Sequence, residues 1–355
     1  MRALIYRGPG VLELADRPDT ALGPYEVRVA VESAGICGTD LRILRGGHSA
    51  YAGVTNRVPG HEIVGRVVEI GRGVAATLTK GDRVFVAPNI GCGKCLWCRR
   101  GMENLCPDTQ ALGVTMDGGL AERVIVPARA VERGNLIAVD GATASDPLVL
   151  IEPLACVVRA QEAVSVGSGD RVFVAGAGPT GLLHVALARS RGAELIIVSD
   201  RSGMRRAAAS RLGAGVTIDW STTNPEEAVA EQTSGIGVDV VITAAPSPEA
   251  QQAAVRMAAP RGRVVLFGGL PRERATVALD TNAVHYKELL VTGTTASTLA
   301  DCRNAAALLS TALGDLSWMI THRFALSDAE EAFARAQDRS ALKIVLNPAR
   351  DRWSS

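Results

Sequence analysis

The most constraining feature of this sequence is a glycine turn that stands between a strand and a helix. It reads G-x-G-x-x-G, directly follows the strand RVFVA, and consists of Gly176, Ala177, Gly178, Pro179, Thr180 and Gly181. The first glycine permits a tight turn, the second lets the backbone approach a pyrophosphate, and the third allows a helix to pack closely on a strand. From about residue 169 onward strands and helices alternate, which is typical of a parallel, doubly wound sheet. The sequence therefore predicts an α/β domain that binds a dinucleotide.

An acidic residue ends the next strand, LIIVSD, about 20 residues beyond the turn. A carboxylate at this place, Asp200, can accept hydrogen bonds from the adenosine ribose, which favours NAD over NADP. Positive charge nearby is the opposing signal, because Arg201, Arg205 and Arg206 could each bind a 2′-phosphate. A glycine turn with no ligand is the alternative interpretation, although strand, turn, helix and acid stand in register.

The first third of the chain is predicted to be mainly β. Four runs rich in Val and Ile, each bounded by Gly, Pro or Asp, read as strands at 27–36, 63–71, 83–88 and 121–127. Toward the C-terminus we expect an Ala- and Leu-rich helix over 300–313. A further helix should follow, and Ser327 with a glutamate three residues on predicts a capping box at its start.

Four of the seven cysteines fall in one short window with the spacing C-x2-C-x2-C-x7-C: Cys92, Cys95, Cys98 and Cys106. Thiolates at this spacing can converge on one tetrahedral ion, and four of them leave no open position on it. We therefore predict a structural zinc site. An iron–sulfur cluster and unrelated reduced cysteines are the alternatives.

A second set of metal-binding side chains is dispersed along the chain. It comprises Cys37 in GICGTD, His61 and Glu62 in PGHE, and Glu152 in IEPLAC. A thiolate, an imidazole and a carboxylate from separate loops are typical of a catalytic zinc, because such a mixed site can keep one position for water or substrate. Taken singly, each of these residues would more often be part of a core.

Composition argues against two classes of partner. The 38 Lys and Arg residues nearly balance the 37 Asp and Glu residues, and the net charge of +1 gives no large field for holding nucleic acid. No stretch reaches the ~20 apolar residues of a membrane span, and the N-terminus lacks the apolar region of about 7–15 residues that export requires. We expect a cytoplasmic protein that binds neither nucleic acid nor membrane.

With these motifs in this order, the whole chain resembles the zinc-dependent medium-chain dehydrogenase/reductase superfamily. The stretch GHEIVGRVVEIGRGV is similar to the zinc-site signature of that family. The resemblance implies a mainly β, GroES-like catalytic domain over 1–156 and 296–355 that holds two zinc ions, and a Rossmann NAD-binding domain over 157–295. It also implies a homodimer or homotetramer formed through the edges of the Rossmann sheet.

The motifs EPLAC and GHE resemble the polyol, threonine and glucose dehydrogenase branch of the family. In that branch Glu62 or Glu152 is implied as the third zinc ligand, and Cys156 is an alternative. The sequence departs from sorbitol-type enzymes in two places, with Arg42 where they commonly have histidine and TTASTLADC where they tend to have a Phe-Arg-Tyr substrate patch. Sorbitol itself is therefore not the expected substrate.

The resemblance implies hydride transfer between a secondary alcohol and NAD, with a polyol, sugar or cyclitol as substrate. Zinc lowers the pKa of the substrate hydroxyl, and the nicotinamide accepts the hydride. The implied catalytic residues are Glu62, Thr39 as the hydrogen-bond partner of the substrate oxygen, and His48 as the end of a proton relay. Thr39 could instead be a turn residue and His48 a loop histidine. The alternative functions are a threonine or amino-alcohol dehydrogenase, a ketone reductase, and a non-catalytic NAD-binding protein.

Overall fold

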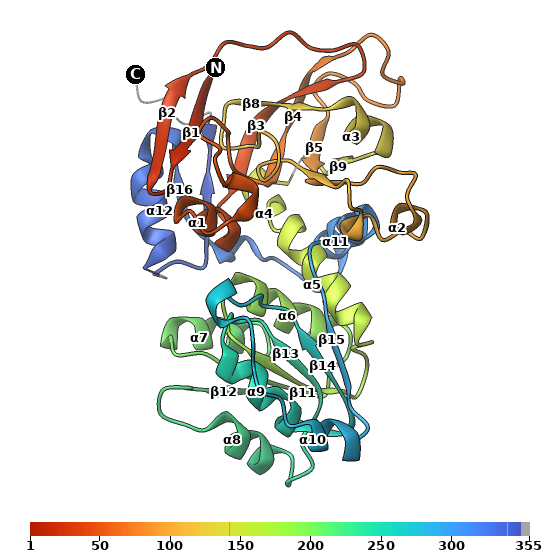
Figure 1. The fold of residues 1–355 in the computed structure, drawn as a ribbon, viewed down its shortest axis with the longest axis vertical. Coiled ribbons are helices and arrows are strands. Elements are labelled where there is room, and N and C mark those ends of the chain that lie inside the picture. The colour runs from red at the N-terminus through yellow and green to blue at the C-terminus, as the bar shows by residue number, and fades with distance from the viewer. Residues whose placement is uncertain (142, 339, 349–355) are drawn as a thin grey trace. The chain divides into compact units, whose positions relative to one another are not determined.

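The computed structural model describes residues 1–141, 143–338 and 340–348 (Figure 1). The chain separates into two compact units. Unit 1 comprises Met1–Ala155 and Ala296–Ser355, and unit 2 comprises Cys156–Thr295. The boundary falls within helix α5 (Ile151–Ala163). Within the described ranges, no helix combines the length and the hydropathy needed to cross a membrane.

Unit 2 contains a six-stranded sheet in which all neighbouring strands are parallel. Its order is β12-β11-β10-β13-β14-β15, from strands β10 (Arg171–Ala175), β11 (Leu195–Ser199), β12 (Val216–Ile218), β13 (Val238–Thr243), β14 (Ala258–Leu266) and β15 (Leu290–Gly293). The connecting helices are α6 (Pro179–Ser190), α7 (Gly203–Arg211), α8 (Pro225–Gln232), α9 (Pro248–Met257) and α10 (Thr281–Tyr286). The order reverses at β10, so the glycine turn lies at the switch point where doubly wound sheets bind ligands.

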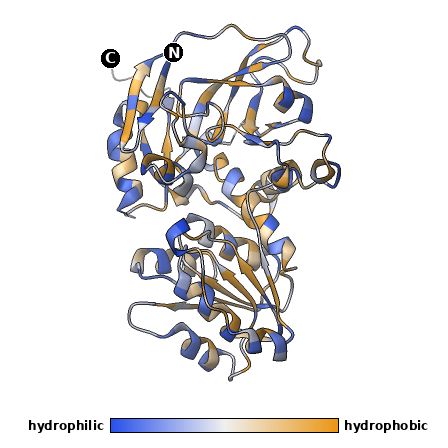
Figure 2. Ribbon diagram, in the orientation of Figure 1, coloured by the Kyte–Doolittle hydropathy of each residue, from blue (hydrophilic) through white to orange (hydrophobic). Residues whose placement is uncertain are grey.

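The central strands of this sheet are apolar along almost their whole length, as Figure 2 shows. In β10 the four residues from Val172 to Ala175 are all buried, and β11 and β13 are similar. Helices cover both faces of a parallel sheet, so its strands read as continuous hydrophobic runs rather than as alternating ones. The predicted doubly wound fold is confirmed.

Unit 1 is built on a mainly antiparallel sheet of seven strands. Its path is β16-β17-β3-β4-β5-β9, and β8 pairs with β3 off this path, from strands β3 (Val27–Gly35), β4 (Glu62–Ile70), β5 (Arg83–Val86), β8 (Arg123–Val126), β9 (Leu136–Ala138), β16 (Ile320–Phe324) and β17 (Lys343–Leu346). Two small sheets accompany it, formed by β1 (Arg2–Gly8) with β2 (Val11–Asp16) and by β6 (Asn89–Ile90) with β7 (Gln110–Ala111). The helices are α1 (Gly38–Leu44), α2 (Leu96–Arg99), α3 (Ala128–Arg133), α4 (Ser145–Leu148), α11 (Leu299–Thr311) and α12 (Ala329–Gln337).

The pairing of three strands positions the candidate site in unit 1. Strands β3 and β4 are antiparallel, and Gly35 pairs with Glu62 at their junction. The C-terminal strand β17 also pairs with β3, where Val345 lies opposite Gly35. A segment from the far end of the sequence is thereby placed beside the GHE motif.

The capping box predicted at Ser327 is wrong. Residues Leu326–Asp328 form a turn of 3-10 helix, so Ser327 lies inside this turn, and α12 begins after Asp328 without a side-chain cap. A capping box does occur at the start of α11, where Thr298 and Asp301 satisfy each other's backbone N–H groups.

Candidate metal centres and nucleotide-binding loop

The four clustered cysteines come together in a small lobe of unit 1, which comprises residues 89–111 from β6 to β7. The sulfur atoms of Cys92, Cys95, Cys98 and Cys106 all lie within 4.8 Å of one another. Backbone N–H groups point at three of them: Cys95 N–H donates to Cys92 Sγ at 3.3 Å, Cys98 N–H to Cys95 Sγ at 3.4 Å, and Cys92 N–H to Cys106 Sγ at 3.4 Å. These donors stabilise thiolates, and four convergent thiolates are the ligand set of a structural zinc. The residues therefore fit the predicted ion.

The electrostatic environment of these thiols is uneven. Hydrogen bonds from the backbone N–H groups of Lys94 and Cys95 lower the pKa of Cys92 to about 6, so this thiol ionises readily. Burial raises the pKa of Cys98 to about 12. A bound cation would remove that imbalance, because a thiol that coordinates a metal is deprotonated outright.

The lobe is anchored to the first turn of α11. The buried carboxylate of Glu103 accepts a hydrogen bond from the backbone N–H of Leu299 at 2.6 Å. The side-chain amide of Asn89 also donates to the carbonyl of Ser297 at 3.1 Å. These two bonds join the lobe to residues 196 and 208 positions away in the sequence.

The dispersed residues Cys37, His61 and Glu62 also assemble. Cys37 follows β3 and is the N-cap of α1, whereas His61 and Glu62 stand at the start of β4. One ligand atom from each lies within 4.8 Å of the others. A Cβ atom at Gly35 would lie 1.8 Å from a carboxylate oxygen of Glu62, so only glycine leaves room for this side chain. Sulfur, nitrogen and oxygen donors converging here fit a zinc ion with an open position.

Asp40, which the sequence analysis missed, lies against two of these ligands. Its buried carboxylate accepts a hydrogen bond from Cys37 N–H at 2.8 Å and lies 3.6 Å from His61 Nδ1. Burial by itself lowers the pKa of His61, but Asp40 and Cys37 outweigh it and raise the pKa well above its usual value. A carboxylate behind a histidine ligand fixes the ring orientation and strengthens it as a donor. The spacing C-x-x-D was a possible signal.

Lys343, also missed, forms a buried ion pair with Glu62. Its Nζ donates to Glu62 Oε1 at 2.5 Å and to the carbonyl of Ile36 at 3.1 Å. Burial alone lowers the pKa of Lys343, but Glu62 and Cys37 raise it above its usual value, so the lysine is charged. A lysine at the head of an otherwise apolar strand, KIVL, is the only signal in the sequence.

Glu152 is buried in the first turn of α5. Burial raises its pKa to about 6, with His61 and Glu62 among the charges that act on it. Glu152 therefore belongs to the same neighbourhood, but it lies outside the set of three whose ligand atoms come within 4.8 Å. Cys156 lies in unit 2 and is not in either cluster of metal-ligating side chains found among the described residues.

The two residues predicted for substrate chemistry lie close to this centre in the sequence. Thr39 is half-buried in the first turn of α1. His48 is also half-buried, and its Nδ1 accepts a hydrogen bond from Ala50 N–H at 3.2 Å, which caps a short 3-10 helix. Burial and the charge of Arg42 lower the pKa of His48, and His61 and Asp40 also act on it.

The glycine turn of unit 2 has the shape that a dinucleotide needs. Gly176 has a φ of +99°, and a Cβ atom at Gly181 would lie 1.9 Å from the carbonyl oxygen of Gly176. At Gly178 the nearest atom to a Cβ would be Arg205 Nη1 at 3.8 Å, which leaves open space beside the loop. Pro179 and Thr180 form the first turn of α6, whose N-terminus offers N–H groups to a phosphate.

Asp200 closes this loop from the adjacent strand. Its carboxylate accepts hydrogen bonds from Ala177 N–H and Ser202 N–H, both at 2.8 Å. The neighbouring arginines differ in environment. Arg201 is exposed, and Arg205 lies next to Gly178.

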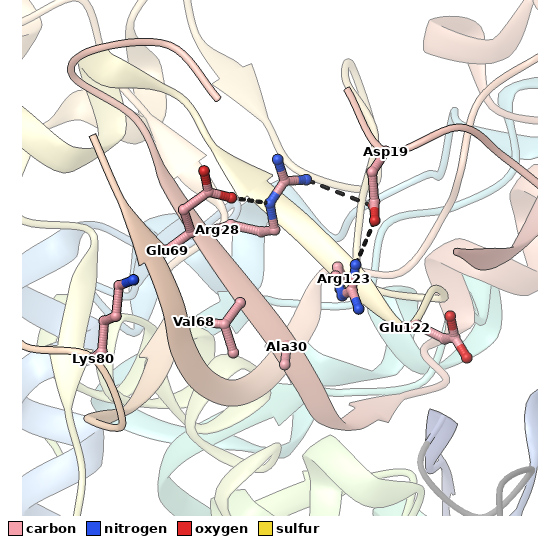
Figure 3. Close-up of a pocket in the computed structure, with 8 residues that line it drawn as sticks. All are labelled: Asp19, Arg28, Ala30, Val68, Glu69, Lys80, Glu122 and Arg123. Carbon is pink, nitrogen blue, oxygen red and sulfur yellow. Dashed lines mark hydrogen bonds and ion pairs between the residues drawn. The ribbon is translucent and has the colours of Figure 1, made fainter. Parts of the chain in front are cut away.

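A separate cavity of about 590 Å³ opens on strands β3, β4 and β8 of unit 1 (Figure 3). It contains no residue of the predicted sites. Its acidic and basic side chains neutralise one another, for example where Arg28 lies between Asp19 and Glu69. We assign it no function.

Comparison with known protein families gives two matches along the chain. Residues 23–139 match the alcohol dehydrogenase GroES-like domain, and residues 179–311 match the zinc-binding dehydrogenase domain.

Individual proteins match over nearly the whole chain. L-Threonine 3-dehydrogenase from Pyrococcus horikoshii is 35% identical over 353 residues, covering 97% of this chain and 98% of that protein. Sorbitol dehydrogenase from Halalkalibacterium halodurans is 31% identical over 353 residues, covering 98% and 99%. The crystal structure of a zinc-binding dehydrogenase from Sinorhizobium meliloti, bound to NADP, is 32% identical with a TM-score of 0.90 and covers 98% and 99%.

Proposed function

The chain belongs to the zinc-dependent medium-chain alcohol dehydrogenase family, and we propose that it transfers a hydride between a secondary alcohol and NAD. The convergence of Cys37, His61 and Glu62 carries the proposal, because three dispersed residues assemble into a mixed donor set. When bound, zinc supplies Lewis acidity that lowers the pKa of the substrate hydroxyl, and the nicotinamide accepts the hydride.

The residues around this centre divide into ligands and supports. Cys37, His61 and Glu62 hold the catalytic ion, and Glu152 is the alternative carboxylate ligand. Asp40 faces the Nδ1 atom of His61 at 3.6 Å, and its negative charge favours the orientation in which Nε2 is turned to the metal. Lys343 supplies a positive charge that balances buried carboxylate. The four cysteines of the lobe hold a second, structural zinc.

Thr39 and His48 are the proposed route for the proton of the hydroxyl group. Thr39 hydrogen-bonds the substrate oxygen, and this residue is half-buried in the first turn of α1, two positions after the ligand Cys37. For His48, the bond from Ala50 N–H to Nδ1 places the proton of the neutral ring on Nε2. The nitrogen left to take up a proton is then Nδ1, so protonation requires His48 to release the N–H of Ala50.

For the cofactor we propose NAD, bound by the glycine turn, the N-terminus of α6 and Asp200. Both oxygens of the Asp200 carboxylate already accept a backbone N–H, and each retains a lone pair for a ribose hydroxyl. Arg205 lies beside the glycine turn, where it can reach the pyrophosphate.

The substrate class we favour is a polyol, sugar or cyclitol, with sorbitol itself not expected. A second candidate is L-threonine or an amino alcohol, because a threonine dehydrogenase is a relative that is 35% identical.

The deciding experiment follows nicotinamide absorbance with both cofactors against L-threonine, polyols, inositols and aminocyclitols, with zinc content measured in parallel. Turnover of one class assigns the substrate. A protein that is fully loaded with zinc but turns over no alcohol or ketone is instead a non-catalytic NAD-binding protein.

We further propose a homo-oligomer in a reducing, cytoplasmic setting. Strand β15 is an edge of the unit 2 sheet, and Leu290 on it and Tyr286 just before it are 51% and 79% exposed. Edge strands with exposed apolar side chains favour pairing with a second chain. Light scattering after gel filtration distinguishes a dimer from a tetramer.

A further inference from the structure

The end of β12 brings a second carboxylate beside the proposed ribose-binding acid. Asp200 N–H donates to the carbonyl of Ile218 at 3.1 Å, and Asp219 is the next residue. Asp219 Oδ1 accepts hydrogen bonds from the hydroxyl and the N–H of Ser221 at 2.5 and 2.9 Å. These bonds lower the pKa of Asp219, so its carboxylate is charged at neutral pH.

This carboxylate holds Arg206. The Nη1 atom of Arg206 lies 2.9 Å from Asp219 Oδ2, and it also donates to the carbonyls of Asp200 and Arg201 at 2.7 and 3.0 Å. The guanidinium therefore contacts the backbone of the acid that would bind the ribose, while its charge is paired with Asp219.

The position of Arg206 matters for the choice between the two cofactors. NADP carries a doubly charged phosphate on the ribose, and an arginine near the acid is what accommodates such a group in this fold. Arg205 lies at the glycine turn and Arg201 is exposed, whereas Arg206 touches Asp200 directly.

We propose that Asp219 is a specificity-determining residue that disfavours NADP by keeping Arg206 paired. The inference rests on the proposed binding of a nicotinamide dinucleotide by unit 2. Asp219 acts through the arginine rather than through the cofactor, so it is a positioning residue. Its removal leaves the charge of Arg206 without a carboxylate partner, while the bonds to the carbonyls of Asp200 and Arg201 keep the guanidinium beside the ribose-binding acid.

The test is equilibrium binding of NADH and NADPH, followed by nicotinamide fluorescence, in the full-length protein. Asp219→Asn keeps an acceptor for Ser221 but removes the charge. We expect the Kd for NADPH to fall about tenfold, equivalent to ~1.4 kcal/mol, and the Kd for NADH to change less than twofold. An unchanged ratio of the two constants would overturn the inference.

Two further variants separate the arginine from general charge effects. Arg206→Ala alone should leave both constants within twofold, because the side chain is already engaged; a fivefold or greater loss of NADPH affinity would show that it binds the phosphate in the native protein. In the double variant Asp219→Asn/Arg206→Ala the gain in NADPH affinity over the native protein should fall below threefold. A larger remaining gain would assign the effect to repulsion between Asp219 and the 2′-phosphate and would contradict the role of Arg206.

Glu226→Gln is the matched control. It removes the same charge and breaks another arginine–carboxylate pair of unit 2, in which Arg256 makes two hydrogen bonds of 2.6 and 2.7 Å to Glu226. We expect no change in the ratio of the two constants, and an equal shift in this variant would overturn the inference. A native protein that binds neither NADH nor NADPH would refute the proposed function itself, which is a separate outcome.

Discussion

The two candidate metal centres obtain their side chains in opposite ways. The lobe takes all four sulfur atoms from one short window, whereas the second centre joins the end of β3, the start of β4 and, through Lys343, the C-terminal strand. The first centre can form locally once a cation is present. The second exists only when the seven-stranded sheet has its native register, because Gly35 must pair with Glu62. The four-cysteine centre is therefore expected to maintain structure, whereas the centre of Cys37, His61 and Glu62 depends on a sheet that has already formed.

Removing a thiolate from the dispersed centre is the most severe way to test this division. We expect Cys37→Ser to lower turnover about 1000-fold or more, which corresponds to ~4 kcal/mol or more of barrier, because the ion loses its sulfur ligand. The melting temperature should change little, since Cys37 is only half-buried and lies beyond the end of β3, whose pairing with β4 is unaffected. Steady-state rates and thermal unfolding measure the two effects. A large fall in the melting temperature would contradict the claim that this centre serves catalysis rather than stability.

The corresponding change in the lobe should act on stability. A complete four-thiolate site contributes ~10 kcal/mol or more, and we expect Cys95→Ser, which leaves three thiolates, to weaken zinc binding and to lower the free energy of unfolding by about 3–4 kcal/mol. Atomic absorption and denaturant unfolding check this result. Activity of the molecules that remain folded should stay within a few-fold of normal. A loss of activity without loss of stability would reverse the assignment of the two centres.

The smallest expected effect concerns the ion pair that supports the dispersed centre. Lys343→Met leaves Glu62 buried without its partner, which typically costs about 3 kcal/mol in the metal-free protein. Zinc should restore part of this loss, because the cation takes over the neutralisation of Glu62. Thermal unfolding with and without chelator measures the difference, and Lys343→Arg is the charge-preserving control. An equal loss in both states would show that Lys343 supports only the fold.

The sign of the pH dependence follows from the same ion pair. Since the pKa of Lys343 is raised in the folded protein, its contribution is fully present below the ordinary lysine pKa and disappears as the pH rises through the folded value. The stability difference between the native protein and Lys343→Met should therefore be constant at neutral pH and shrink only under strongly alkaline conditions.

The sequence was informative where the determining interactions are local. The run 27–36, predicted as a strand, contains β3, and the glycine turn stands between β10 and α6 as predicted. Both features could be predicted because a strand's burial pattern and a turn's chemistry are set by neighbouring residues. The same locality explains why the cysteine spacing identifies the lobe. Ser327 shows the limit of prediction from local sequence, because it lies inside a 3-10 turn and α12 begins only after Asp328.

The supports of the dispersed centre could not be predicted in the same way. Lys343 and Glu62 are 281 positions apart, and only the pairing of β17 with β3 brings them together. Asp40 is close to Cys37 in the sequence, but its relation to His61 depends on the fold. The roles assigned to Thr39 and His48 remain predictions that rest on family resemblance.

The hydrogen bond between Glu103 and Leu299 has a consequence for how such a protein can evolve. Within the lobe, Glu103 provides the acceptor for the backbone N–H of Leu299 at the start of α11. Deleting the lobe would therefore leave this N–H group of the helix terminus unsatisfied. A descendant that dispensed with the cysteines would have to retain this carboxylate, or acquire a new cap for the helix, before it could shorten the loop.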